Sequence, residues 1–244
     1  MRCALVGVLA LLAGEAAAQE PALEALMKTA PRCDPARKHC LALRLHVAVG
    51  DAGPVAAADW VARQLQQANR HFAPLDLGFQ VAGVTALPAA AARIEDAKER
   101  TELAPLVAGT VIDVFVTAQL DDIDIKDGVI YGVTWPKGAK KYIIISTMAW
   151  ERTLSHELGH VFGLPHSGYA ISIMNKSDRK EPPIEQRTFH PHELAVMRGQ
   201  LQRMLREKVV EDVPPPKPAA TAPAAAAPAT STQSAAPAPS LKQP

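Results

Sequence analysis

Two histidines and a glutamate in the second half of the chain have the types and spacing that zinc-dependent hydrolysis requires. His156 and His160 are four residues apart, so on a helix both imidazoles lie on one face, one turn from each other. That spacing suits two ligands of one tetrahedral zinc ion. Glu157 directly follows the first histidine, and its carboxylate could take a proton from a zinc-bound water and pass it to a leaving amine.

The residues that follow could supply a third ligand by turning the chain back. Gly163 can adopt the positive φ that ends a helix, and Pro165 prevents the helix from resuming. His166 then approaches the metal from the other side, which completes the pattern H-E-x-x-H-x-x-G-x-x-H over residues 156–166. Structural zinc sites usually close with a fourth protein ligand, often cysteine. Because every cysteine lies far upstream, the pattern predicts a catalytic zinc ion with one open position.

This segment resembles the zinc-binding motif of the metzincin metallopeptidases, in which a methionine-containing turn follows the third histidine. A Ser-Ile-Met-Asn sequence at residues 172–175 stands where that turn is expected. The resemblance implies that Met174 lies beneath the zinc ligands as a hydrophobic base and is not itself a ligand. Ser167, directly after the third histidine, is similar to the matrixin (matrix metalloproteinase-like) branch. The resemblance therefore implies a zinc metalloendopeptidase.

The elements around the motif have the order of an α/β (α+β) domain. Apolar and polar residues alternate over 41–49, which predicts a half-buried strand with His46 on its solvent side. Further strands are expected over 77–84, 110–117, 128–135 and 142–146, and helices over 55–72, 148–162 and 192–207. This order predicts a mixed sheet with about three helices. The resemblance implies a metzincin-like zincin domain, with a twisted sheet, an antiparallel edge strand beside the cleft and an active-site helix that ends at Gly163.

The best match to that edge strand is the segment from residue 128 to residue 135. An extended peptide could add to it as an extra strand and present its scissile carbonyl to the zinc ion. The candidate substrate-binding residues are therefore Gly128, Val129, Ile130, Tyr131 and Gly132. Ordinary strand packing explains Tyr131 equally well, so its role stays open.

A calcium ion has little support in the sequence. Four aspartates, at residues 121, 122, 124 and 127, precede the expected edge strand. Their spacing does not match an EF-hand loop, because Lys126 occupies a ligand position. A solvated acidic turn is the favoured interpretation, and calcium remains an unsupported alternative.

The two ends of the chain differ in composition from its centre. Residues 1–18 have the basic start, short apolar segment and small-residue cleavage site of a signal peptide, which predicts export to the periplasm or the extracellular space. Residues 211–244 form a tail rich in proline and alanine that we expect to be disordered. Between them we expect an N-terminal extension over 19–40 and the metzincin-like catalytic domain over 41–210.

The formal net charge of +1 argues against a general nucleic-acid partner. The chain contains no apolar run long enough for a membrane span. We expect a monomer that acts on a protein or peptide substrate.

Cys33 and Cys40 have two alternative interpretations. Two cysteines in an exported protein suggest a disulfide, which for so short a loop would contribute about 2–3 kcal/mol. The sequence Pro-Arg-Cys at residues 31–33 also resembles the start of the matrixin latency segment, in which a thiolate occupies the open zinc position. The residues that follow do not match the rest of that segment, so the disulfide is favoured.

The sequence therefore predicts an exported zinc endopeptidase in which Glu157 is the general base. The alternative from another class is a binding or adhesion module that retains zinc on a metzincin-like scaffold without turnover. A zinc hydrolase of non-peptide amides is a weaker third hypothesis.

Overall fold

The computed structural model describes residues 21–213, so the expected signal peptide and all but the first three residues of the expected tail lie outside the described residues. The strands are β1 (His39–Gly50), β2 (Gly53–Pro54), β3 (Leu77–Leu87), β4 (Arg93–Ile94), β5 (Ile112–Thr117), β6 (Gln119–Leu120), β7 (Gly132–Lys137) and β8 (Lys140–Ser146). The α-helices are α2 (Ala58–Phe72), α3 (Ala97–Glu102), α4 (Thr153–Val161) and α5 (Pro191–Arg206), and residues 21–29 are also helical. None of the helices between residues 21 and 213 has both the length and the apolar composition that a membrane crossing requires.

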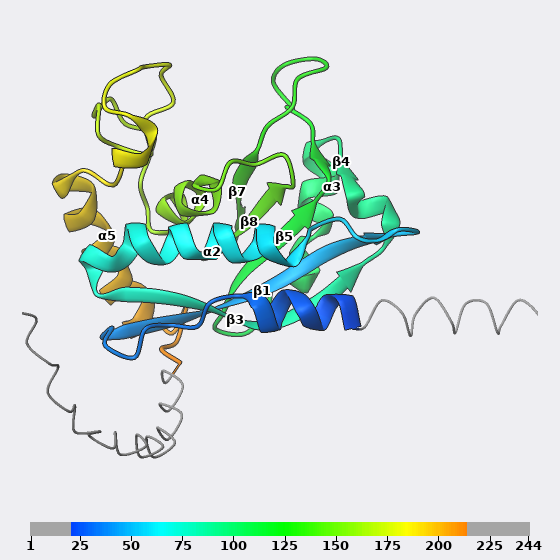
Figure 1. Ribbon diagram of the computed structural model, residues 1–244, viewed down its shortest axis with the longest axis horizontal. Coiled ribbons are helices and arrows are strands. Elements are labelled where there is room, and N and C mark those ends of the chain that lie inside the picture. Colours follow the sequence, from blue (N-terminus) through cyan, green and yellow to red (C-terminus); the bar gives the residue numbers. More distant parts are fainter. Residues whose placement is uncertain (1–20, 214–244) are drawn as a thin grey trace, which may run out of the picture.

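The main sheet is mixed and ends in an antiparallel edge strand, as the sequence and the resemblance predict. β1 pairs in parallel with β3 on one side and with β5 on the other, and β5 pairs in parallel with β8. β7 pairs antiparallel with β8 and ends the series (Figure 1). The short β2 folds back on the end of β1 as a hairpin. Within the described residues β7 is therefore the last strand of the main sheet, and it lies in contact with α4.

The larger hydrophobic core lies between one face of the sheet and the helices. Inward-facing residues of β1, β5 and β8 pack there against apolar residues of α2, α4 and α5. The members with the lowest exposure include Leu43, Val114, Ile143, Leu65, Phe72, Leu158 and Met197. In α2, Val61, Leu65, Ala68 and Phe72 recur at helical spacing and form the buried stripe. Burial of this face fixes the position of α4 relative to the sheet.

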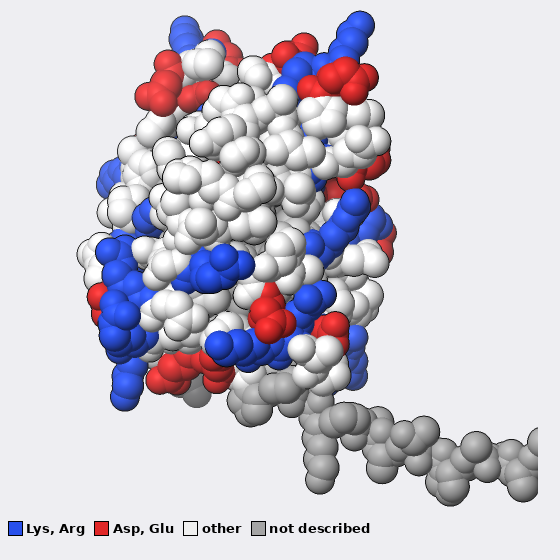
Figure 2. Space-filling view, turned by 90° about the vertical axis from the view of Figure 1, so that its left-hand side faces the viewer, with Lys and Arg blue, Asp and Glu red and all other residues white. Residues whose placement is uncertain are grey.

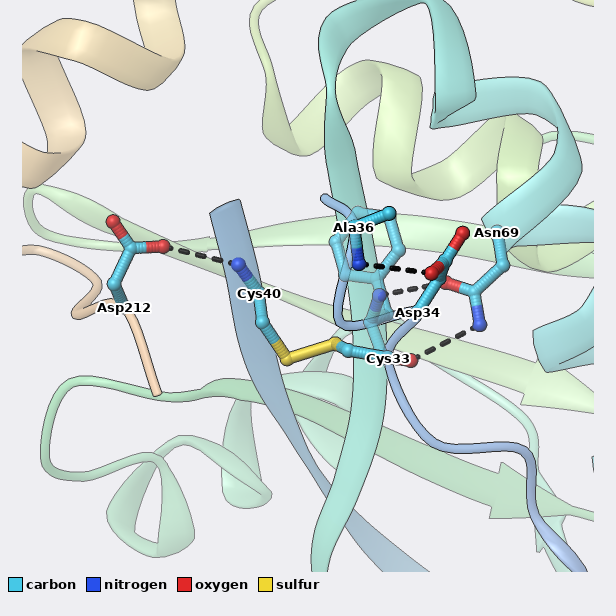
Figure 3. The surroundings of a disulfide bond; sticks show 7 residues. Cys33, Asp34, Ala36, Cys40, Asn69 and Asp212 are labelled. Carbon is cyan, nitrogen blue, oxygen red and sulfur yellow. Dashed lines mark hydrogen bonds between the residues drawn. A yellow bond between two sulfur atoms is a disulfide. The ribbon is translucent and has the colours of Figure 1, made fainter. Parts of the chain in front are cut away.

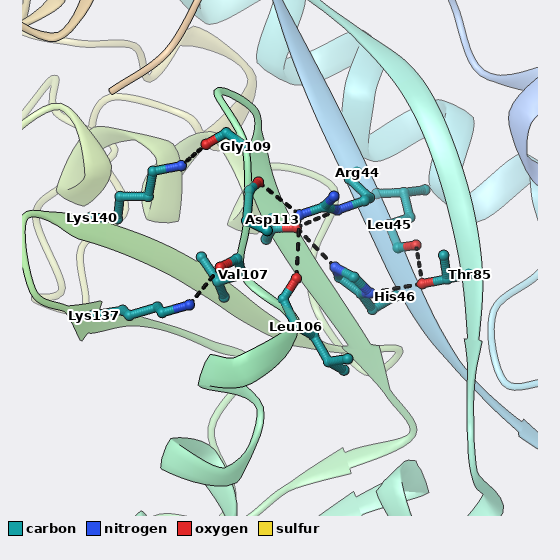
Figure 4. A network of polar contacts seen from close by, with 11 residues as sticks. Arg44, Leu45, His46, Thr85, Leu106, Val107, Gly109, Asp113, Lys137 and Lys140 are labelled. Atoms are coloured by element: carbon teal, nitrogen blue, oxygen red, sulfur yellow. Dashed lines mark hydrogen bonds and ion pairs between the residues drawn. The ribbon is translucent and has the colours of Figure 1, made fainter. Parts of the chain in front are cut away.

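The second face of the sheet is also buried, so the prediction that His46 faces solvent is wrong. The chain between β3 and β5 covers this face, and His46 is 4% exposed and stacks on Phe115. Its ring nitrogens lie 2.8 Å from Asp113 Oδ1 and 2.7 Å from Thr85 Oγ1 (Figure 4). Arg44 Nε donates to the same aspartate oxygen at 2.7 Å. The alternation along β1 therefore separates two buried faces, one apolar and one with a polar network.

Residues 21–40 pack against the sheet on the side away from β7. Leu26 in the helical segment 21–29 is buried in the larger core. Cys33 and Cys40 form a disulfide beside the start of β1, and the backbone N–H of Cys40 donates to Asp212 Oδ1 (Figure 3). With both sulfurs in this bond, neither offers a thiolate to the histidines.

Candidate active site

Helix α4, which carries the first two histidines, begins later than predicted. It starts at Thr153 and not at Met148, because the preceding residues form turns in which the Thr153 N–H donates to Trp150 O at 2.8 Å. The buried side chain of Gln64 in α2 donates to the same carbonyl at 2.8 Å and accepts from the Leu154 N–H at 3.1 Å. A side chain of α2 therefore defines the first turn of α4.

His71 makes a second contact between α2 and α4, and it predicts a pH effect on stability. His71 is 5% exposed, and its Nδ1 lies 2.9 Å from Ser155 Oγ. Burial, together with the nearby Arg70, lowers the pKa of His71 to about 4. As pH falls below about 6.5, the unfolded chain binds a proton at this position and the folded protein does not, so stability is lost in that window.

We therefore expect the wild-type protein to lose about 2 kcal/mol more than a His71→Gln variant between about pH 7.5 and about pH 5. The measurement is urea unfolding of both proteins at the two pH values, with a chelator present so that the other histidines carry no metal in either sample. Equal losses in the two proteins would show that His71 is not the group responsible.

Helix α4 ends in a turn that returns the chain toward the histidines. Gly163 has φ of +87°, a conformation that glycine adopts without strain. Its N–H donates to His160 O at 3.1 Å, and the N–H of Leu164 donates to Gly159 O at 3.0 Å. After this turn His166 lies opposite the face of α4 that carries the other two histidines.

The three histidines present their Nε2 atoms to one point. The Nε2 atom of His160 lies 3.2 Å from that of His156 and 3.2 Å from that of His166. All three ligand atoms lie within 4.8 Å of one another. Two nitrogens bound to one tetrahedral zinc at the usual bond length would be separated by about 3.3 Å. The spacing of the side chains therefore fits a single zinc ion.

Hydrogen bonds also fix which ring nitrogens are free to bind a metal. Nδ1 of His156 lies 2.8 Å from Ile173 O, and Nδ1 of His160 lies 2.7 Å from Leu164 O. A backbone carbonyl only accepts, so both Nδ1 atoms carry the proton and both Nε2 atoms present lone pairs. Burial lowers the pKa of His156 and of His166 to about 4. Neutral imidazoles whose lone pairs converge are the donor set that zinc prefers.

Glu157 is the one buried carboxylate among the residues that line the site. It is 4% exposed, and burial raises its pKa to about 7. The Thr134 hydroxyl on β7 donates to Glu157 Oε2 at 2.8 Å, so the edge strand orients the carboxylate. A carboxyl with a pKa near neutrality suits both proton uptake and proton release.

Gly132 leaves room for this carboxylate. A Cβ atom at Gly132 would lie 3.0 Å from both Cγ and Oε1 of Glu157. We therefore expect Gly132→Ala to displace the carboxylate and to lower kcat/KM by about 10-fold while zinc content stays unchanged. Gly83→Ala in β3 is the matched control, because no atom lies within 4 Å of its added Cβ. Equal activity of the Gly132→Ala and Gly83→Ala proteins would rule out this role.

Met174 lies below the helix that carries the histidines. It is fully buried, and its Sδ would lie 2.6 Å from a Cβ added at Gly159. The Ser172 hydroxyl accepts from the Met174 N–H at 2.9 Å and donates to the carboxylate of Glu193, with distances of 2.8 and 2.7 Å to the two oxygens. Glu193 also accepts from the His190 N–H at 2.7 Å in the capping box of α5. The start of α5 therefore supports the methionine turn.

Sequence reasoning missed Gly159, Thr134 and Glu193. Proline at residue 191 followed by Glu193 is typical of the first turn of a helix and could have indicated the role of Glu193 at the helix start. No sequence signal connects Glu193 to Ser172, because that contact depends on the path of residues 167–190.

The histidines and Glu157 line an open cleft of about 1070 Å³. β7 forms one wall, α4 the floor, and residues 173–187 the opposite wall; in Figure 1 the loops before β7 and before α5 rise on the two sides of α4. Of the candidate substrate-binding residues, Val129, Ile130, Tyr131 and Gly132 line the cleft, and Gly128 is not among its lining residues.

The expected strand over 128–135 is partly wrong. β7 starts at Gly132, so the four preceding candidate residues lie outside the strand. The Ile130 N–H donates to Leu120 O at 2.9 Å, and Val129 forms an isolated bridge with Asp121. The apolar pattern continues through this segment, but Val129 and Ile130 pair with β6 and the residue after it, and only Tyr131 bonds to β8, where its carbonyl accepts from the Ser146 N–H at 3.0 Å.

No protein-family model and no curated protein sequence matches the chain. Among solved structures, archaemetzincin from Methanopyrus kandleri superposes with a TM-score of 0.48 at 17% identity, covering 68% of this chain and 98% of that protein. Metalloproteinase-II from Bacteroides fragilis gives 0.48 at 13% identity, covering 68% of this chain and 54% of that protein. A zinc-dependent peptidase from Methanocorpusculum labreanum gives 0.43 at 15% identity, covering 64% of this chain and 99% of that protein. At these levels of similarity, a functional assignment depends on the site itself.

Proposed function

We propose that this chain is an exported zinc-dependent endopeptidase, a metzincin similar to the matrixin branch. The observation that carries the proposal is the convergence of three imidazole Nε2 atoms beside a buried glutamate in an open cleft. Three ligands leave one position of a tetrahedral ion free for substrate, which is the arrangement of catalytic and not of structural zinc. The close approach of the Met174 Sδ to Gly159 in α4 supports the role of a hydrophobic base that the metzincin resemblance implies for this residue.

The site residues have separate roles in the proposed reaction: metal binding, proton transfer and positioning of the carboxylate. A bound zinc ion would polarise the peptide carbonyl and increase the acidity of a water at the open position. His156, His160 and His166 would hold that ion. Glu157 removes the proton from the attacking water, and the protonated carboxyl then delivers it to the nitrogen of the breaking C–N bond. Thr134 keeps the carboxylate in position during both transfers.

The open edge of β7 is the proposed binding surface for the peptide backbone. β7 pairs with β8 on one side and ends the main sheet, so its other edge has main-chain groups available for an added strand. This geometry would lay an extended peptide along the cleft with one carbonyl beside the histidines.

Export is proposed from the leader-like sequence of residues 1–18. The disulfide between Cys33 and Cys40 supports it, because such bonds persist in oxidising compartments. We also propose that the chain acts as a monomer.

The test is cleavage of a random peptide library by the full exported chain loaded with zinc. We expect internal peptide bonds to be cut, the activity to disappear with a chelator, and zinc to restore it. One zinc per chain with no cleavage of any peptide would instead identify a binding or adhesion module. Cleavage of small amides alone would identify a non-peptide hydrolase.

A further inference from the structure

One side of the cleft carries an excess of positive charge. The segment before α4 and the segment from residue 173 to residue 187 contribute five basic and one acidic side chain to its lining, namely Arg152, Lys176, Arg179, Lys180, Arg187 and Asp178. Three of these basic groups are guanidinium groups close enough to affect one another. Burial, and then repulsion by Arg187 and Arg179, lowers the pKa of Arg152 to about 10.

The three arginines differ in how their donors are used. Arg179 donates four hydrogen bonds to backbone carbonyls of residues 170–177 and so holds that loop in place. Arg187 donates through Nε to Pro182 O and through Nη2 to Arg179 O, and its Nη1 group makes no hydrogen bond to residues 21–213. Arg152 donates none to the described part of the chain, and its guanidinium lies over the Trp150 ring, 4.7 Å from the centroid. Arg152 therefore has the most free donors.

No carboxylate among residues 21–213 lies within ion-pair distance of these three arginines. Some arginines elsewhere have such a partner, as Arg63 has Glu151 at 3.1 Å and Arg93 has Asp121 at 2.6 Å. On the face shown in Figure 2, acidic side chains are present among the basic ones. Glu185 attracts Arg152 from beyond ion-pair distance. The cleft therefore concentrates unpaired positive charge beside the histidines.

Arg152 is half-buried, so its charge is partly removed from water. No carboxylate of the described residues forms an ion pair that would offset this cost. A ligand carboxylate that formed a two-point hydrogen bond with the guanidinium would supply that compensation. Arg152 is the N-cap residue of α4 and stands four residues before His156, so the two backbones are separated by about 6 Å along the helix axis. That length corresponds to about two residues of an extended peptide.

We propose that the cleft selects peptides with a carboxylate within two residues of the scissile bond, and that Arg152 binds this carboxylate with Arg187 beside it. The inference rests on the proposed function, because it assigns a substrate class to the same cleft. The carboxylate could belong to an Asp or Glu side chain or to the carboxyl terminus of the substrate. The shared chemistry is an anion held by a guanidinium.

The test compares cleavage by the zinc-loaded full chain of two random libraries, one with amidated and one with free carboxyl termini. Enrichment of Asp or Glu near the cut in the amidated library identifies a side-chain carboxylate. Cleavage confined to the last two bonds of the free library identifies a terminal carboxylate and would make the enzyme a carboxypeptidase instead of the proposed endopeptidase. Peptide pairs are then made from the preferred sequence, with Asp or Asn at the selected position, or with a free or amidated terminus.

We expect Arg152→Gln to reduce the preference for the acidic member of a pair by about 10- to 100-fold. Arg206→Gln, an exposed arginine on α5 outside the cleft, is the matched control and should keep the wild-type preference. Arg152→Glu should turn the preference toward Lys or Arg, a result that a folding defect would not produce. Cleavage without any acidic preference, or a preference that survives both Arg152 changes, would overturn the inference and leave the peptidase proposal intact.

A second measurement separates the two proposals if no peptide is cut. The zinc-loaded Glu157→Gln protein is used to retain peptides from the same libraries, and the retained sequences are identified. Enrichment of carboxylates that Arg152→Gln removes would support the anionic site although the peptidase function failed. Retention without such enrichment would contradict the inference.

Discussion

A Glu157→Gln protein is expected to keep one zinc ion per chain and to lose about 1000-fold in kcat/KM for peptide hydrolysis. The amide retains the shape of the carboxyl group and can still accept from the Thr134 hydroxyl, which lies 2.8 Å from Oε2 in the wild type. It cannot take a proton from water or return one to the leaving amine. The substitution therefore removes proton transfer and preserves the contacts around the metal ligands.

The control for this substitution is Glu151→Gln. Glu151 is exposed, pairs with Arg63 and is not a cleft residue, so its removal should leave kcat/KM within about twofold of the wild type. Zinc content is measured by elemental analysis, and thermal unfolding checks the fold of both variants. Peptide hydrolysis at the wild-type rate by a zinc-loaded Glu157→Gln protein would contradict the proposed role of Glu157 in proton transfer.

The second large effect is expected at Gly159, where a change that usually stabilises a helix should destabilise this one. Replacing glycine by alanine inside an exposed helix stabilises it by about 1 kcal/mol. At Gly159 the added Cβ would lie 2.6 Å from Met174 Sδ and 3.2 Å from Phe189 Cε1. Both side chains are buried, so relief of the overlap requires movement of the methionine turn at a cost of about 1–3 kcal/mol.

That movement should also weaken zinc binding. Ile173 precedes Met174, and its carbonyl accepts from His156 Nδ1 at 2.8 Å. Loss of such a support for a metal ligand typically lowers metal affinity by about 10- to 100-fold. We therefore expect Gly159→Ala to lower both the free energy of unfolding of the metal-free protein and the affinity for zinc.

The matched control is Gly199→Ala in α5, where no atom lies within 4 Å of the added Cβ. The two variants should differ by about 1–3 kcal/mol in free energy of unfolding, with Gly199→Ala the more stable, because both gain the same helix propensity and only Gly159→Ala has the overlap. A Gly159→Ala, Met174→Ala double variant should recover part of the loss, because it vacates the space that the Cβ needs. Equal stabilisation by Gly159→Ala and Gly199→Ala would show that Met174 does not restrict the space at Gly159.

Local sequence patterns predicted the central part of the molecule well. The alternation over residues 41–49 corresponds to β1, and the apolar run over 142–146 corresponds to β8. Both strands lie in the buried sheet, so apolar residues recur along them in the sequence. The spacing of His156 and His160 placed both rings on one face of a helix, because the helical period is independent of tertiary structure. The antiparallel edge strand followed from the family resemblance.

Other features depended on contacts between distant segments. His46 is buried because the chain between β3 and β5 covers it, and the alternation along β1 carries no information about that cover. The start of α4 depends on the side chain of Gln64 in another helix. The positive charge in the cleft arises because residues 176–187, which precede α5, lie on the same cleft as Arg152. Such features arise from tertiary packing, which a local period does not encode.

The most direct test of the zinc peptidase proposal is a titration of the metal-free full chain with zinc, followed by the rate of peptide cleavage. With three histidines and one ion, the rate should rise in proportion to added zinc up to one equivalent per chain and then remain constant. An absence of cleavage at full occupancy, or cleavage that does not depend on zinc, would contradict the proposal that these histidines and Glu157 form a zinc peptidase site.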